Sequence, residues 1–153
     1  AVRLLRLPCL ALALAALFGC ATNIDHVPKT SATTPLFMVY SASPDRTWSA
    51  TQAALSASGR FRAVDRASGV MVTEFKVVDS VELSMFDKVM LGKTYRTNYT
   101  VSLRQLAPER TEVSVNVGVQ GRQFGITTEE EQPQLKAFMR QKLFDQIGAI
   151  LRP

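Results

Sequence analysis

The side chains best suited to nucleophilic, redox or metal chemistry are few, and all of them lie near the beginning of the chain. Among 153 residues there are two cysteines, Cys9 and Cys20, and one histidine, His26. Histidine is the usual general base at neutral pH, and thiols and imidazoles are the usual zinc ligands. Because the chain beyond residue 35 has neither, we expect no catalytic residues, no metal site and no cofactor there. The sequence thus predicts a protein that is not an enzyme.

Three consecutive glutamates form the densest acidic cluster, Glu129 to Glu131. Consecutive residues of a helix point in different directions, so these carboxylates cannot all converge on one cation. Acidic side chains do stabilise the positive amino-terminal end of a helix. We therefore expect the cluster at a helix start that is capped by Thr127 or Thr128.

The formal net charge is +5, but the basic residues are spread along the chain. No five of them are consecutive, and none interleave with aromatic residues as nucleic-acid-binding segments do. Arg60, Arg62 and Arg66 could form a small patch facing lipid phosphates, although a solvated face is the favoured interpretation. We therefore expect no nucleic-acid partner.

The first 19 residues have the layout of an export signal. Arg3 and Arg6 form a positive segment, and Leu10 to Phe18 form a short apolar segment. That segment is about half as long as the roughly twenty residues that a membrane-spanning helix needs. We expect it to be removed rather than to remain as a transmembrane anchor.

The four residues Leu17-Phe18-Gly19-Cys20 resemble the lipobox of bacterial lipoprotein signals. The resemblance implies cleavage before Cys20 and acylation of that cysteine, for example with palmitate. Ala21 follows where aspartate would signal inner-membrane retention, which implies the outer membrane. We expect a protein held by lipid on the periplasmic face of the outer membrane. The alternative is an ordinary signal peptide with a spare cysteine.

Residues 21–35 are rich in threonine, serine, alanine and proline, with few large apolar side chains. Such a segment buries too little surface to offset its ordering entropy, so we expect a flexible tether. Fully extended, it would reach about 50 Å at ~3.3 Å per residue. The predicted organisation is a signal peptide (1–19), a lipidated cysteine with its tether (20–35) and one domain (36–153).

Local patterns predict a first helix surrounded by short strands. Leu36 to Ser41 is an apolar strand candidate. Pro44 to Ser58 is predicted to be helical, because Ser43 suits the N-cap and Gly59 suits the carboxyl end; Trp48, Thr51, Gln52 and Leu55 fall on one face. Alternating apolar residues predict four further strands: Phe61–Val64, Val70–Phe75, Tyr95–Leu103 and Val113–Val119. The last two form a hairpin with one dry and one wet face.

The carboxyl end has the strongest helical pattern. Apolar residues recur there at helical spacing: Leu135, Phe138, Met139, Leu143, Ile147, Ile150 and Leu151. Lys136, Arg140, Gln141 and Asp145 are expected on the opposite, solvated side. The predicted class is α+β, with a curved antiparallel sheet of four to five strands packed on this long helix and a second helix after the first strand.

Several stretches occur in the order of a known family: Ser41–Trp48 entering a helix, Asp65–Glu74 turning into a strand, and the hairpin of Tyr95–Leu103 with Thr111–Val119. In these stretches the body resembles the helix-grip domain of the BamC (NlpB) family, outer-membrane lipoproteins linked to the β-barrel assembly machine. The resemblance implies an interaction module without catalytic activity. Family members have two such domains, whereas this chain has room for one.

The segment Ser80 to Gly92 is the best candidate for a binding surface, because methionine-rich apolar surfaces adapt to varied partners. Its candidate contacts are Met85, Phe86, Met90 and Leu91; the alternative is a short helix packed on the core. Tyr95 and Tyr99 share one strand face and are expected to line the core or a groove.

We therefore expect an accessory or scaffolding module of an envelope complex, in which the lipid fixes the location and the tether raises the effective concentration at a protein partner. The alternative is a carrier of a small hydrophobic ligand such as a lipid, held in an apolar cavity between sheet and helix. The residues expected to line that cavity are Met71, Phe75, Met85, Phe86, Met90 and Phe124.

Overall fold

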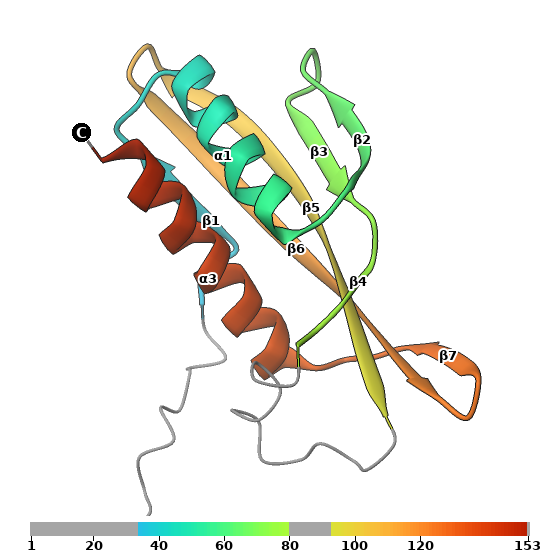
Figure 1. Cartoon of the computed structure of the whole chain (residues 1–153). Helices are drawn as coiled ribbons and strands as arrows, with labels where there is room; N and C mark the ends of the chain where they lie inside the picture. The colour runs from blue at the N-terminus through green and yellow to red at the C-terminus, as the bar shows by residue number, and fades with distance from the viewer. Residues whose placement is uncertain (1–33, 80–92, 153) are drawn as a thin grey trace, which may run out of the picture.

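The computed structural model describes residues 34–79 and 93–152 and has an α+β fold (Figure 1). Its elements are β1 (Phe37–Tyr40), α1 (Pro44–Ser58), β2 (Phe61–Asp65), β3 (Val70–Thr73), β4 (Lys76–Val77), β5 (Thr94–Ala107), β6 (Arg110–Gln123), β7 (Ile126–Glu129) and α3 (Pro133–Leu151). The predicted signal, Cys20 and nearly all of the tether lie outside the described residues, as does the candidate segment Ser80 to Gly92.

The strands form one open antiparallel sheet. Its main path runs β1-β6-β5-β3-β2, while β4 pairs with β5 and β7 pairs with β6. The sheet has seven strands, so the predicted number of four to five was too small. The difference lies in β4 and β7, which have two and four residues and are too short to show a strand period. The long β5–β6 hairpin forms the backbone of the sheet and extends beyond both predicted strands.

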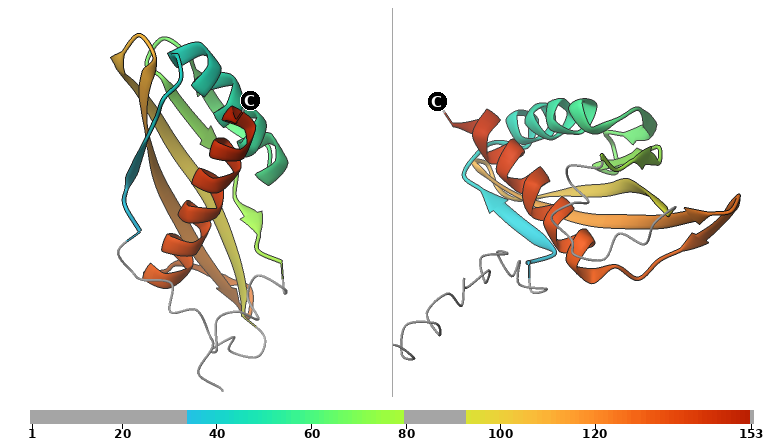
Figure 2. Two further views of the ribbon diagram at one scale, coloured as in Figure 1. Left: turned by 90° about the vertical axis from the view of Figure 1, so that its left-hand side faces the viewer. Right: turned by 60° about the horizontal axis from the view of Figure 1, so that its bottom comes forward.

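Both helices lie on the same face of the sheet (Figures 1 and 2). The core forms where they meet the inward-facing positions of β5 and β6, since side chains alternate between the two faces of a strand. Its most completely buried apolar side chains are Leu55, Met71, Val101, Val113, Val115, Val117, Leu143, Phe144 and Ile147. Neither α1 nor α3 covers the other face of the sheet, and the hairpin side chains on that face are mostly polar.

The bounds predicted for α1 are confirmed. Ser43 accepts a hydrogen bond from the backbone N–H of Arg46 at 3.4 Å, and Gly59 N–H donates to Leu55 O at 3.0 Å. Trp48, Thr51 and Leu55 are buried as expected, whereas Gln52 faces solvent. Gln52 differs because an amide side chain at the border of the apolar stripe gains more from water than from the core.

The predicted start of the last helix was wrong. Thr127 and Thr128 lie in β7, and α3 begins at Pro133 after Gln132, with no acidic residue in its first turn. Proline is favoured at the first helical position because its missing N–H would have no partner there. The three glutamates therefore have other roles. Glu130 pairs with Lys93 at 2.6 Å, and Glu131 pairs with Lys136 at 3.0 Å.

Candidate functional site

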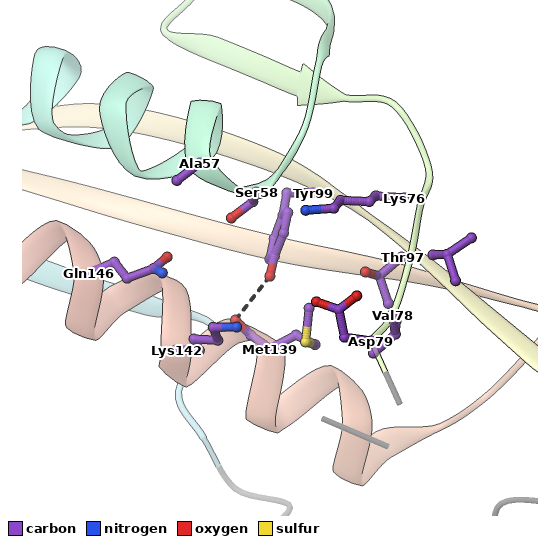
Figure 3. Close-up of a pocket in the computed structure, with 11 residues that line it drawn as sticks. Ala57, Ser58, Lys76, Val78, Asp79, Thr97, Tyr99, Met139, Lys142 and Gln146 are labelled. Atoms are coloured by element: carbon purple, nitrogen blue, oxygen red, sulfur yellow. Dashed lines mark hydrogen bonds between the residues drawn. The ribbon is translucent and has the colours of Figure 1, made fainter. Parts of the chain in front are cut away.

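A polar cleft lies between the carboxyl end of α1, β4 and α3, with β5 as its floor (Figure 3). Its volume is about 190 Å³, smaller than the roughly 300–1,000 Å³ of pockets for drug-sized ligands. The polar side chains around it are Ser58, Lys76, Asp79, Thr97, Lys142 and Gln146. The cleft therefore has room and charge for a small polar group.

Tyr99 forms the floor of this cleft and is held at both ends. Its hydroxyl donates to Met139 O at 3.4 Å (Figure 3), and its backbone N–H donates to Thr73 Oγ1 at 2.9 Å. The residue is 4% exposed. Lys76 and Lys142 bring positive charge to the cleft and Asp79 brings a negative charge. The lining contains no histidine or cysteine, so it favours hydrogen bonding and ion pairing over proton transfer at neutral pH.

Of the predicted binding residues, the structure describes Tyr95 and Tyr99. Both lie on the helix-facing side of β5 and are buried, in agreement with the expectation of core or groove lining. Tyr99 reaches the cleft, whereas Tyr95 lies beneath Lys93, whose Nζ is 5.5 Å from the ring centroid. The remaining candidates lie outside the described residues: Met85, Phe86, Met90 and Leu91.

The apolar cavity predicted for a hydrophobic ligand is not formed by those of its residues that are described. Met71 is fully buried in the core, and Phe124 is 93% exposed. The Phe75 ring lies 3.6 Å from where a Cβ on Gly118 would be, and Gly118 alternates with the inward-facing valines of β6. Phe75 therefore packs on the sheet face away from the helices. The other three predicted lining residues lie outside the described residues: Met85, Phe86 and Met90.

The basic residues near the first turn are exposed, as expected for a solvated face: Arg60, Arg62 and Arg66. Arg66 forms an ion pair with the exposed Asp45 at 2.6 Å. Its guanidinium also lies 5.8 Å from the centroid of the Trp48 ring, close enough for a cation–π contact. These contacts tie the β2–β3 turn to the start of α1.

The pattern of α3 placed Arg140 on the solvated side, and this prediction was wrong. Arg140 is 7% exposed and is the one charged residue that is buried among residues 34–79 and 93–152. Its Nε donates to Val115 O and its Nη1 donates to Thr34 O, both at 3.0 Å. Burial lowers the pKa of the guanidinium from its ordinary value. Because that ordinary value is very high, the group stays charged at neutral pH.

The sheet explains why a carbonyl is available to Arg140. Along one side of β6, β1 pairs as far as Ser114 and β7 begins to pair at Gln120. Val115 O lies in the gap between these two strands and accepts from Arg140 instead. Thr34, the other acceptor, is the first described residue and lies at the end of the predicted tether. Arg140 therefore links the backbone at Thr34 to β6 and α3.

Within the described parts of the chain, no three His, Cys, Asp or Glu side chains gather in a way that could hold a metal ion. The helices described there are also too short or too polar to cross a bilayer. No protein-family model matches this chain, and no curated protein matches its sequence significantly. The functional conclusion therefore rests on the chain's own residues.

Proposed function

We propose that this protein is a bacterial envelope lipoprotein, anchored to the periplasmic face of the outer membrane through acyl chains on Cys20. The observation that carries the proposal is the order of a basic segment, a short apolar segment and Leu17-Phe18-Gly19-Cys20 at the start of the chain. Each buried methylene contributes about 0.8 kcal/mol, so two or more acyl chains hold a domain of this size on a membrane. Ala21 after the cysteine supports the outer membrane as the destination.

We further propose that the domain of residues 36–153 is a helix-grip-like, non-enzymatic accessory or scaffolding module of an envelope complex. The absence of cysteine and histidine after residue 35 supports this. So does Arg140, which links Thr34, at the end of the proposed tether, to β6 and α3. A tethered module needs only weak contacts, since the anchor raises its effective concentration at a partner in the same membrane.

The carrier alternative gains no support from the geometry. Its cavity would need Met71, Phe75 and Phe124 to line one space. Met71 lies in the core, Phe75 lies on the opposite sheet face, and Phe124 lies in a solvent-exposed turn. The cleft beside Tyr99 is polar and suits a hydrophobic ligand poorly.

Crosslinking in intact cells, followed by purification and mass spectrometry, tests this function. Wild type and Cys20→Ser should be compared with Cys9→Ser, which removes the other cysteine and leaves the lipobox intact. We expect one recurrent envelope protein with wild type and Cys9→Ser, and much less of it with Cys20→Ser. Equal recovery with Cys20→Ser would contradict the tethering mechanism. A co-purifying hydrophobic molecule without a protein partner would favour the carrier.

A further inference from the structure

The β6–β7 hairpin ends in a turn with an unusual residue. Gln123 pairs with Ile126, so Phe124 and Gly125 form a two-residue turn. Their φ angles are 50° and 82°, which is the pattern of a type I′ turn. That turn favours Asn-Gly, because its first position is left-handed and a bulky side chain there is strained. Phenylalanine at this position therefore lowers the stability of the fold relative to asparagine.

The same turn carries the two most exposed large apolar side chains of the described residues. Phe124 is 93% exposed and Ile126 is 68% exposed. Packing does not explain them, because neither belongs to the core. A strained backbone and exposed apolar side chains at one position together indicate binding.

The direction of β1 shows at which end of the domain the described chain begins. β1 runs antiparallel to β6, with Phe37 opposite Ser114 and Tyr40 opposite Thr111. Followed backwards towards Thr34, the chain therefore runs along β6 towards the end that carries Phe124. In Figure 1, β1 begins at the lower part of the sheet and the β6–β7 hairpin projects from the same lower end. The described chain thus enters the domain at the end from which the turn projects.

The chemistry of the turn fits a bilayer better than a protein. Between residues 122 and 128 the only charged side chain is Arg122, which is exposed and positive. Two apolar side chains at a turn offer half or less of the about 800 Å² that each partner buries in a stable protein interface, so the turn is too small to be the main docking surface of the proposed module. A bilayer contact needs no such area when acyl chains already hold the protein at the surface.

We infer that Phe124 and Ile126 insert into the surface of the bilayer that holds the lipid anchor, with Arg122 beside the lipid phosphates. The inference rests on the proposed lipoprotein function. The turn would give the domain a second contact with the membrane and so a defined orientation on it. The tether alone would leave the domain free to rotate.

The test uses the full-length lipidated protein in phosphatidylethanolamine–phosphatidylglycerol vesicles. Once Cys20 is acylated, Ile126→Cys introduces the only free thiol of the mature chain, and an environment-sensitive fluorophore is attached to it. Glu109→Cys is the matched control, because it lies in the exposed β5–β6 turn at the other end of β6. Nitroxide-labelled lipids then report which label touches the bilayer.

We expect quenching of the label at position 126 and little at position 109. Adding Phe124→Asn to the labelled Ile126→Cys protein should lower the ratio of bilayer-bound to free turn by about tenfold. This variant keeps a residue that the turn favours, so misfolding would not explain the loss.

Equal quenching of the two labels, on protein that floats with the vesicles, would overturn the inference and leave the lipoprotein proposal intact. If the label at position 126 is shielded from water without vesicles, and more so at higher protein concentration, the inference is overturned. The turn would then bind a second copy of the chain. Protein that carries no lipid and does not float would contradict the lipoprotein proposal, and the inference with it.

Discussion

Arg140 of α3 donates a hydrogen bond to the carbonyl oxygen of Thr34 at 3.0 Å, so the carboxy-terminal helix holds the first described residue of the domain. The same guanidinium donates to Val115 O of β6, also at 3.0 Å. One buried side chain thus joins the backbone at Thr34, the sheet and the helix.

Arg140→Met should lower the free energy of unfolding by about 1–3 kcal/mol, because it leaves the carbonyls of Val115 and Thr34 without their donor. Urea denaturation of the chain without its signal measures the effect. Lys136→Met on the same helix is the control. It removes an ion pair with the 91% exposed Glu131 side chain and should cost less than about 1 kcal/mol. Equal costs for the two variants would contradict the role assigned to Arg140.

The Lys93–Glu130 pair predicts a defined pH dependence. The hydrogen bond between them lowers the pKa of Glu130 from its ordinary 4.5 and raises the pKa of Lys93 from its ordinary 10.5. The stabilisation from Glu130 is present above its ordinary pKa and is lost as the pH falls through the lowered value. The stabilisation from Lys93 is present below its ordinary pKa and is lost as the pH rises through the raised pKa.

Glu130→Gln should therefore lower the free energy of unfolding at neutral pH and have progressively less effect in acid. Chemical denaturation of both proteins across the acid range measures the difference. Glu131→Gln is the neighbouring control and should matter less at neutral pH, because its carboxylate side chain is 91% exposed. A Glu130→Gln effect that stays constant down to strongly acidic pH would show that the charge of the carboxylate does not stabilise the fold.

Two glycines with positive φ angles offer a matched comparison. Gly69 has φ +71°, and a Cβ added there would lie 2.7 Å from Leu103 O. Gly125 has φ +82° with open space around it. Gly125→Ala should cost about 1–2 kcal/mol from backbone strain, and Gly69→Ala should cost more because of the added clash. Thermal unfolding ranks the two, and the reverse order would contradict the described β2–β3 turn.

Phe124→Asn should stabilise the isolated domain by about 1 kcal/mol, because asparagine tolerates the left-handed conformation that Phe124 adopts. The same substitution should weaken the bilayer contact. Denaturation in the absence of lipid measures the first effect. A loss of stability would show that the ring supports the fold, which removes the argument that it is present for binding.

Local sequence signals predicted the elements that are long or that have clear capping or turn residues at their ends. Ser43, Pro44 and Gly59 define α1 because capping chemistry is local, and the alternating valines of β6 define the hairpin because one face is buried. The start of α3 was misplaced because glutamates and threonines before Pro133 imitate a helix start. The strand β7 was missed because its four residues are too few to show a strand period.

The misplaced site residues failed for tertiary reasons. Arg140 lies three and four residues from the buried Ala137 and Phe144, and so shares their helix face. A count of apolar residues did not reveal that Arg140 is buried, because a guanidinium is buried only where backbone carbonyls that lack another donor can accept its hydrogen bonds. Phe75 lies between β3 and β4, where the strand is interrupted, and its ring packs on the far sheet face; Phe124 lies in a turn. Strand periodicity carries no information at either position.

The most direct test of the central claim is mass spectrometry of the amino-terminal peptide of protein purified from membranes of a bacterial host. We expect a mature chain that begins at Cys20 and carries diacylglycerol and a further acyl group. Cleavage elsewhere, or a Cys20 without lipid on membrane-associated protein, would contradict the lipoprotein function.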